Sequence, residues 1–312
     1  MSDVFFLDAS SPLAIDVFLK RVGWLGAAET VLSAERAGEG NMNCTLRVQT
    51  AGRSFILKQS RPWCEKFPHI PAPEERTLVE AAFYREVQNT PSIANPMPRL
   101  LGFDAVARVL MLEDPGAASD FTGLYGGEQL READLAALVK FAADLHGGFT
   151  PGVHLSAHLS NVAMRKLNHE NIFELPLAEV NRGPAFEQRV RLGQMYLGPG
   201  PCLLHGDYFP GSWLRVGESV KVIDPEFCFV GPAEFEIGVM LAHLFPARQP
   251  ETILRGAVDG YRNLAPLNEE LTRQFAGVEI MRRLVGVSQL PLGYGDAERK
   301  ALLDLAVRMT MS

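Results

Sequence analysis

The chain has 312 residues, of which 47% are hydrophobic and 21% charged, so it can bury a large core and divide into two domains. Its formal net charge of −7 disfavours nucleic acid or an anionic membrane as the main partner. No apolar run is long enough to span a bilayer, and the N-terminus has no basic region of the kind that opens a secretion signal. We therefore expect a cytoplasmic protein with no membrane partner.

The first third of the sequence predicts a helix followed by a small β-rich domain. Apolar residues recur at helical spacing from Pro12 to Val22. Strand patterns are interrupted by turn residues, with a glycine-containing turn at 38–43 and a Pro- and charge-rich loop at 61–76. We expect strands at 34–37, 44–48, 54–59, 99–103 and 109–112, and a further helix at 78–87.

The rest of the chain reads as mainly helical after Glu113-Asp114-Pro115-Gly116. Apolar residues at core spacing predict helices at 132–146, 233–245 and 269–287. We place the boundary so that residues 1–112 form an N-terminal lobe and residues 113–312 form a hinge and a helical lobe. This order predicts an α+β fold of the two-lobed, protein-kinase-like kind.

The four cysteines show no Cys-x-x-Cys spacing, so neither a zinc site nor a disulfide framework is indicated. They are Cys44, Cys64, Cys202 and Cys228. We expect buried, unreactive thiols in a reducing compartment.

Two acidic motifs each follow a short apolar strand, and 17 positions separate their aspartates, Asp207 and Asp224. Phosphoryl transfer from ATP needs a carboxylate that takes a hydroxyl proton and oxygen atoms that hold Mg²⁺. We assign Asp207 as the base, and Asp224 and Glu226 as metal ligands. Ser212 lies five residues after Asp207, where a protein kinase has a metal-binding Asn, and offers only a hydroxyl. Polar turns between buried strands would explain either motif alone, but the pair at this spacing favours catalysis.

The turn at 38–43 has the composition of a loop that covers nucleotide phosphates. Gly38 and Gly40 let backbone amides approach phosphate oxygens, and Asn41 and Asn43 complete the turn. A third glycine is absent, so a plain hairpin turn fits this segment nearly as well. Lys58 lies on the second strand after the turn, where a kinase lysine contacts the α- and β-phosphates. That position favours a phosphate contact over a solvated lysine at a strand end.

Two further segments complete the expected ATP site. Glu80, on the helix after Lys58, is the preferred ion-pair partner of that lysine, and Glu86 is the second choice. The expected hinge runs from Glu113 to Pro115, and its backbone carbonyl and amide groups would form hydrogen bonds with the edge of the adenine ring. A plain linker between lobes is compatible with the same sequence.

These motifs resemble the aminoglycoside phosphotransferase and choline kinase superfamily, whose signature is His-Gly-Asp followed by Asp-x-Asp or Asp-x-Glu. Within it, the closest resemblance is to methylthioribose kinases. That family has a Gly-Asp-Gly-Asn-x-Asn turn, like residues 38–43, and Lys-Gln after the strand, like Lys58-Gln59. Its His-Gly-Asp-Leu-His-Thr-Gly-Ser loop is similar to residues 205–212, and its Asp-Pro-Glu-Phe motif is similar to residues 224–227.

The same resemblance assigns twin arginines in a late helix, here Arg282 and Arg283, to the sugar acceptor. Adjacent helical residues point about 100° apart, so both cannot face one cleft squarely. We favour Arg282, although one solvent-facing and one salt-bridged arginine is an equal alternative. The chain departs from the family by its shorter length, by residues 208–210 beside the base, and by Glu236 where an Asp usually braces the catalytic loop. His146 is expected to cap its helix or to bridge to that loop, rather than to bind a metal.

The sequence thus predicts an ATP- and Mg²⁺-dependent kinase that phosphorylates a hydroxyl of a sugar-like metabolite, of the methylthioribose type by resemblance. Another small-molecule kinase, acting on an aminoglycoside, an amino alcohol or another sugar, is the first alternative. A nucleotide-binding pseudokinase that works through a protein partner is the second, and Lys58, Asp207, Asp224 and Glu226 argue against it. A homodimer is compatible with the sequence, which fixes neither the oligomeric state nor the role of the loop at 61–76.

Overall fold

The computed structural model describes residues 5–38, 40, 42–150, 155–175 and 184–311, and the chain forms two compact units. Unit 1 comprises Met1–Gly116, and unit 2 comprises Ala117–Ser312. Asn41, one of the residues expected to contact phosphate, lies outside the described residues.

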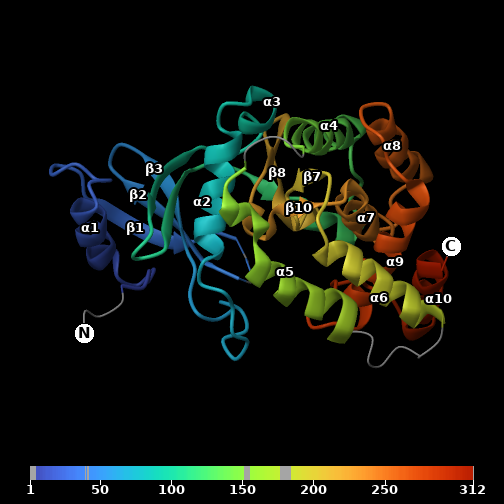
Figure 1. Cartoon of the computed structure of the whole chain (residues 1–312). Helices are drawn as coiled ribbons and strands as arrows, with labels where there is room; N and C mark the ends of the chain where they lie inside the picture. Colours follow the sequence, from blue (N-terminus) through green and yellow to red (C-terminus); the bar gives the residue numbers. More distant parts are fainter. Residues whose placement is uncertain (1–4, 39, 41, 151–154, 176–183, 312) are drawn as a thin grey trace. The chain divides into compact units, whose positions relative to one another are not determined.

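Unit 1 is built on a five-stranded antiparallel sheet with the strand order β1-β2-β3-β5-β4. Its strands are β1 (Val31–Arg36), β2 (Cys44–Thr50), β3 (Ser54–Gln59), β4 (Leu100–Asp104) and β5 (Val109–Glu113). Its helices are α1 (Pro12–Arg21), α2 (Arg76–Val87) and the one-turn α3 (Pro91–Ala94). Helix α1 packs on β1, as the dark blue helix of Figure 1 shows.

The alternation of side chains in β2 gives the sheet of unit 1 its buried face. Cys44, Leu46 and Val48 point to one side and are almost fully buried. They join a core that includes Phe18 and Leu19 of α1. The residues between them, such as Thr45, point to the other side, and Thr45 lies opposite Lys58 of β3. Lys58 therefore lies on the face of the sheet that α1 does not cover.

Unit 2 is mainly helical. Its helices are α4 (Glu132–Gly148), α5 (Val162–His169), α6 (Pro184–Leu197), α7 (Ala233–Leu244), α8 (Glu251–Arg262), α9 (Glu269–Val285) and α10 (Asp296–Met311). Helix α9 packs against both α7 and α10, and α4 packs against α8 (Figure 1). The side chains of α7 are buried along almost its whole length, so this helix lies in the core of unit 2.

Two small sheets in unit 2 position the acidic motifs. Strand β7 (Cys202–Leu204) pairs with β10 (Phe229–Gly231), and β8 (Trp213–Val216) pairs with β9 (Ser219–Val222) and with the two-residue β6 (Ser119–Asp120). The His-Gly-Asp motif follows β7, and Asp224-Pro225-Glu226 follows β9 and precedes β10. The first acidic motif therefore lies in the loop from β7 to β8, and the second lies in the loop from β9 to β10. Because β7 pairs with β10 and β8 pairs with β9, the ends of both loops are fixed by the two sheets.

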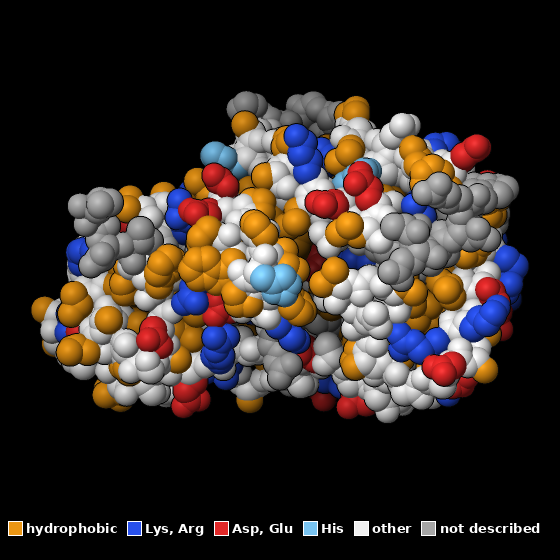
Figure 2. Space-filling view, turned by 90° about the horizontal axis from the view of Figure 1, so that it is seen from below, with side chains coloured by type: hydrophobic (Ala, Val, Ile, Leu, Met, Phe, Trp, Pro, Cys, Tyr) orange, Lys and Arg blue, Asp and Glu red, His pale blue; other side chains and the backbone are white. Residues whose placement is uncertain are grey.

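The surface carries both signs of charge, in keeping with the modest net charge. On the face shown in Figure 2, basic and acidic side chains are intermixed rather than gathered into one large patch. All four cysteines are free and buried, as the sequence predicted. Within the described ranges, no helix combines the length and apolar character needed to cross a membrane.

Candidate active site

Lys58 and Glu80 form a buried ion pair inside unit 1. The Lys58 Nζ lies 2.7 Å from Glu80 Oε2, and both side chains are at most 3% exposed. Strand β3 supplies the lysine, and the middle of α2 supplies the glutamate. The structure thus pairs Lys58 with the glutamate that the sequence favoured, and Glu86 is only half-buried. Such a pair holds a lysine ammonium in a fixed place, where it can contact a phosphate.

The glycine turn joins β1 to β2 and is closed at its base by a hydrogen bond from the Ala37 amide to the Thr45 carbonyl. Gly38 has a φ of +75°, which favours glycine. A Cβ at Gly38 or Gly40 would meet no atom within 4 Å, so open space surrounds this backbone. Asn43 is 5% exposed, and its Oδ1 accepts a hydrogen bond from Arg76.

The expected hinge residues are fixed within unit 1 by ion pairs. Asp114 accepts two hydrogen bonds from the Arg47 guanidinium, at 2.9 and 3.0 Å, and one from the Gly116 amide. Glu113 pairs with Arg99 at 3.2 Å, and its amide donates to the Arg99 carbonyl. Pro115 is half-buried. Hydrogen bonds of the Glu113 and Asp114 side chains and of the Glu113 and Gly116 amides therefore attach residues 113–116 to unit 1.

The catalytic loop of unit 2 is organised by hydrogen bonds around Asp207. The Ser212 Oγ donates to the Asp207 carbonyl at 2.8 Å, and the Ser212 amide donates to the Phe209 carbonyl. His205 Nε2 lies 2.8 Å from the carbonyl of Ile223, which ties this loop to the residue between β9 and Asp224. The hydroxyl of Ser212, 2% exposed, thus holds the backbone of the predicted base.

Glu236, at the start of α7, braces the catalytic loop. Its two carboxylate oxygens accept hydrogen bonds from the amides of His205 and Gly206, both at 2.9 Å. His146 of α4 lies 2.9 Å from the same carboxylate through Nε2 and 2.7 Å from Tyr261 through Nδ1. Burial alone would raise the pKa of Glu236, but the hydrogen bond and charge of His146 hold that pKa below its usual range. Glu236 therefore braces the loop even though its side chain is one methylene longer than that of Asp. His146 bridges to the loop through Glu236, one of the two roles expected of it.

Asp207 has the electrostatic environment of a general base. Burial raises the pKa of this carboxyl to about 6, against the opposing charges of Arg283 and Arg282. Arg283 Nη2 lies 3.8 Å from Asp207 Oδ1, and the Asp207 side chain is 24% exposed. A base whose pKa lies near the working pH accepts a proton readily and remains mostly ionised at neutral pH.

Glu279 of α9 holds both arginines of the twin pair. It accepts hydrogen bonds from Arg282 Nη1 at 2.8 and 3.1 Å and from Arg283 Nε at 2.7 Å. The guanidinium of Arg283 also lies over the ring of Phe209, 5.1 Å from its centroid. His243 Nε2 lies 3.5 Å from Glu279, and burial lowers the pKa of His243 to about 4, so this ring is neutral. Arg283, rather than the favoured Arg282, is the arginine beside Asp207.

The loop after β9 presents Asp224 and Glu226. Asp224 has a φ of +64°, a strained conformation for a residue with a side chain, and strain of this kind is found at functional sites. Asn161 Nδ2 donates to the carbonyls of Glu226 and Cys228 at 2.9 and 3.0 Å and so fixes the turn. The structure therefore brings two carboxylates to one short turn, as their spacing predicted.

The backbone conformation at position 206, and its close contact with Phe227, explain why glycine lies between His205 and Asp207. Its φ is +87°, and a Cβ there would lie 2.0 Å from the Phe227 carbonyl oxygen. Only glycine lets the catalytic loop approach the Asp-Pro-Glu loop this closely.

Three residues that hold parts of the candidate site were not predicted from the sequence. Glu279 could have been found from its spacing, because it precedes the two arginines by three and four residues on one helix. Arg76 precedes Glu80 by four residues in the same way. Asn161 lies 65 residues from Glu226, and no local pattern connects them.

Comparisons with known proteins identify the family and the relatives of the chain. The profile of the phosphotransferase enzyme family (APH) matches residues 33–272. The chain is 28% identical to a methylthioribose kinase from Exiguobacterium sibiricum, over 93% of this chain and 88% of that protein. It is 27% identical to methylthioribose kinase 1 from rice, Oryza sativa subsp. japonica, over 72% of this chain and 58% of that protein.

Solved structures share the fold at low sequence identity. Choline kinase LicA from Streptococcus pneumoniae aligns with a TM-score of 0.57 and 14% identity, over 95% of this chain and 97% of that one. The aminoglycoside phosphotransferase of the gentamicin-APH(2")-IIa complex aligns with a TM-score of 0.56 and 15% identity, over 99% and 97% of the two chains. The predicted protein-kinase-like fold is thus confirmed, and the protein is an enzyme with phosphotransferase activity. Because the family profile covers most of its length, the chain belongs to the phosphotransferase enzyme family.

Proposed function

We propose that the protein transfers the γ-phosphoryl group of ATP, with Mg²⁺, to a hydroxyl of an uncharged sugar of the methylthioribose type. Family membership and the kinase relatives make the chain a small-molecule kinase, and a kinase uses ATP. The identity of the acceptor is the more specific part of the proposal. It is supported by the names of the relatives and, above all, by the two arginines that share Glu279 beside Asp207.

The arginine pair suits an acceptor that carries hydroxyl groups. Arg282 and Arg283 carry two positive charges, which the carboxylates of Glu279 and ionised Asp207 balance. A protonated amine about 4 Å from a guanidinium group would be repelled by it by roughly 1–4 kcal/mol, but the Asp207 carboxylate would attract the same amine by a comparable amount. Aminoglycosides and amino alcohols carry such amines, whereas a sugar presents hydroxyl oxygens that guanidinium groups can hold. The donors of the two guanidinium groups therefore support a sugar acceptor.

The chemistry would divide among the residues in the following way. Asp207 accepts the proton of the acceptor hydroxyl, and Arg283 orients that hydroxyl and keeps Asp207 in place. Lys58, held by Glu80, and the backbone of Gly38 and Gly40 bind phosphate oxygens.

Asp224 and Glu226 would hold Mg²⁺, which neutralises phosphate charge when bound. Carboxylate oxygens are the donors that this ion prefers. Among the described residues, no group of three or more His, Cys, Asp or Glu could hold a metal ion by itself. Nucleotide phosphates and water would supply the remaining oxygens, as is usual for Mg²⁺.

The substrate proposal is tested with purified protein, ATP and Mg²⁺ against methylthioribose, ribose, choline, ethanolamine and gentamicin. We expect methylthioribose to give the highest kcat/KM, and the three amines to give little turnover. A higher kcat/KM for any of the amines would contradict the proposed sugar acceptor.

The role of Asp207 is tested with Asp207→Asn, which should lower kcat by a factor of about 10² or more while the affinity for ATP stays unchanged. In the wild type, kcat/KM for the acceptor should fall as the pH drops through about 6, because Asp207 becomes protonated. Near-normal turnover in Asp207→Asn would remove the base assignment.

A further inference from the structure

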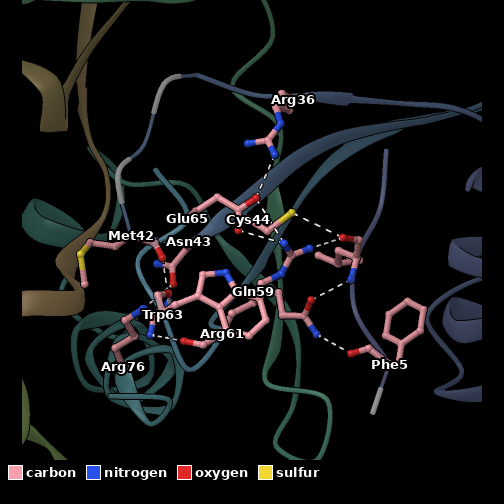
Figure 3. Close-up of polar contacts among 11 residues, drawn as sticks. Phe5, Arg36, Met42, Asn43, Cys44, Gln59, Arg61, Trp63, Glu65 and Arg76 are labelled. Atoms are coloured by element: carbon pink, nitrogen blue, oxygen red, sulfur yellow. Dashed lines mark hydrogen bonds and ion pairs between the residues drawn. The ribbon is translucent and has the colours of Figure 1, made fainter. Parts of the chain in front are cut away.

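Arg76, the first residue of α2 (Figure 3), is a fully buried arginine, and all of its N–H donors have acceptors. Its Nε donates to Asn43 Oδ1 at 2.7 Å. Nη1 donates to the carbonyls of Arg61 and Pro73 at 2.8 and 2.7 Å, and Nη2 donates to those of Met42 and Trp63 at 2.7 and 3.3 Å. A guanidinium has five N–H donors, so each of them has an acceptor.

Two of these acceptors belong to the end of the glycine turn. Met42 and Asn43 immediately precede β2 and follow the glycines expected to cover phosphate. The other three acceptors lie in the loop between β3 and α2, which passes beside the turn. Figure 3 shows the guanidinium of Arg76 pointing toward Met42 and Asn43. One side chain therefore fastens the turn to the start of α2.

The same helix carries the partner of Lys58. Arg76 and Glu80 are four residues apart, so their side chains lie on one face of α2. Glu80 holds Lys58 through the 2.7 Å ion pair, and Lys58 lies opposite Thr45 at the start of β2. Two parts of the expected phosphate site, the lysine and the glycine turn, are thus both attached to the first two turns of α2.

We propose that Arg76 is a positioning residue for nucleotide binding, which sets the glycine turn at a fixed place relative to the Lys58–Glu80 pair. This inference rests on the proposed use of ATP in this unit. Arg76 itself touches no reacting group. It acts through the backbone carbonyl of Met42 and the side chain of Asn43, so its loss disturbs ATP binding rather than the acceptor.

A residue that merely stabilises unit 1 would behave differently. Its replacement would lower the melting temperature but leave the affinity of the folded protein for ATP nearly intact. The conservative change Arg76→Lys separates the two roles, because lysine keeps the positive charge but loses the planar fork that reaches several acceptors at once. Phe83→Leu serves as the stability control, since Phe83 is buried in the same helix but makes none of these contacts. Arg85→Lys, an exposed arginine of α2, controls for the substitution itself.

The first experiment measures the dissociation constant of ATP, together with KM for ATP and for the acceptor, below the melting temperature of every variant. Arg76→Lys should weaken ATP binding about tenfold, the effect expected from losing one or two hydrogen bonds of a charged group. The acceptor KM should stay close to the wild-type value. Phe83→Leu and Arg85→Lys should bind ATP as the wild type does.

The second experiment needs no catalysis. Hydrogen exchange of ATP-free protein is followed in peptides that cover residues 42–50 and, for comparison, residues 109–113. Arg76→Lys should speed exchange in the first peptide and not in the second. Asn43→Ala removes one acceptor and should have the same local effect, and the effects of the two changes on ATP binding should be less than additive if they act through one contact.

The outcomes separate this proposal from the proposed function. Unchanged ATP affinity in Arg76→Lys, or ATP affinity lost to the same degree in Phe83→Leu, overturns the positioning role. Strictly additive effects of Arg76→Lys and Asn43→Ala overturn it as well. If the wild type binds no ATP, the proposed function fails, and this inference fails with it, whatever the exchange data show. If Arg76→Lys does not fold, the test rests on Asn43→Ala alone. Unchanged hydrogen exchange in residues 42–50 of that variant would then contradict the proposal.

Discussion

Glu279 provides the sharpest test of the acceptor side of the site, through the substitution Glu279→Gln. This carboxylate is 1% exposed and accepts three hydrogen bonds from Arg282 and Arg283. Glutamine has nearly the same shape and can still accept hydrogen bonds, but it leaves two guanidinium groups close together in the interior of unit 2 without a shared counter-charge.

The magnitude follows from this burial. Removing one partner of a buried ion pair costs about 3–5 kcal/mol, and glutamine recovers part of the hydrogen bonding, so we expect the free energy of unfolding to fall by about 3 kcal/mol. For a unit of this size the melting temperature should drop by about 6–12 °C. Arg283 should also lose its fixed place beside Asp207, so the acceptor KM should rise at least several-fold while KM for ATP stays nearly unchanged.

The pKa of Glu279 determines how the stability difference between the wild type and Glu279→Gln changes with pH. Burial alone would raise the pKa of Glu279, but Arg282 and Arg283 hold that pKa far below its usual range. The folded state therefore binds this proton less readily than the unfolded state does, and the contribution of Glu279 is present above the unfolded pKa of about 4.3. It is lost as the pH falls below that value, so the stability gap between wild type and Glu279→Gln should narrow in acid.

The assay is urea unfolding at several pH values, with Glu251→Gln as the matched control. Glu251 forms an ion pair with Arg255 at 2.7 Å, but both side chains are more than 70% exposed, so its loss should cost at most about 1 kcal/mol. A Glu279→Gln protein as stable as Glu251→Gln at neutral pH, with an unchanged acceptor KM, would refute the reasoning.

Two further predictions concern the acidic loops. Asp224→Ala should abolish the extra rise in melting temperature that ATP gives with Mg²⁺ over ATP with EDTA, because a ligand of the ion is lost; a full Mg²⁺-dependent shift in the variant would place the metal elsewhere. Gly206→Ala should lower the free energy of unfolding by about 3 kcal/mol or more, since it adds a clash with Phe227 to an unfavourable backbone conformation. Gly217→Ala is the control, because Gly217 has a φ of +60° but no atom within 4 Å of the added Cβ, so this change should lower the free energy of unfolding by only about 1–2 kcal/mol. Equal decreases in the two variants would show that the contact with Phe227 contributes nothing.

Much of the site could be predicted because its parts are set by local order along the chain. Lys58 ends a strand, Glu80 lies on the next helix, and the two acids follow strands, so short-range patterns suffice to place them in such a fold. The order of the elements likewise predicted a sheet followed by a helical unit, which the related structures confirm.

What could not be predicted depends on packing between distant segments. The rotation of α9 decides that Arg283 lies beside Asp207, and this rotation is set by contacts with α7 and α10. The burial of Arg76 is set in the same way, by a loop that folds back over it. Helices α5, α6, α8 and α10 were not foreseen, and α8 follows a proline-containing segment without a helix-capping side chain.

The contact between Gly206 and Phe227 has a consequence for how this enzyme can change over evolution or in the laboratory. The catalytic loop and the Asp-Pro-Glu loop meet through main chain, with no side chain between them to absorb a shift. A displacement of either loop must therefore be matched by the other, so a change in one segment requires a change in the other, although their aspartates are 17 positions apart. New acceptor preferences are more easily reached by exchanging residues outside these loops, or by transplanting both loops together, than by replacing either one alone.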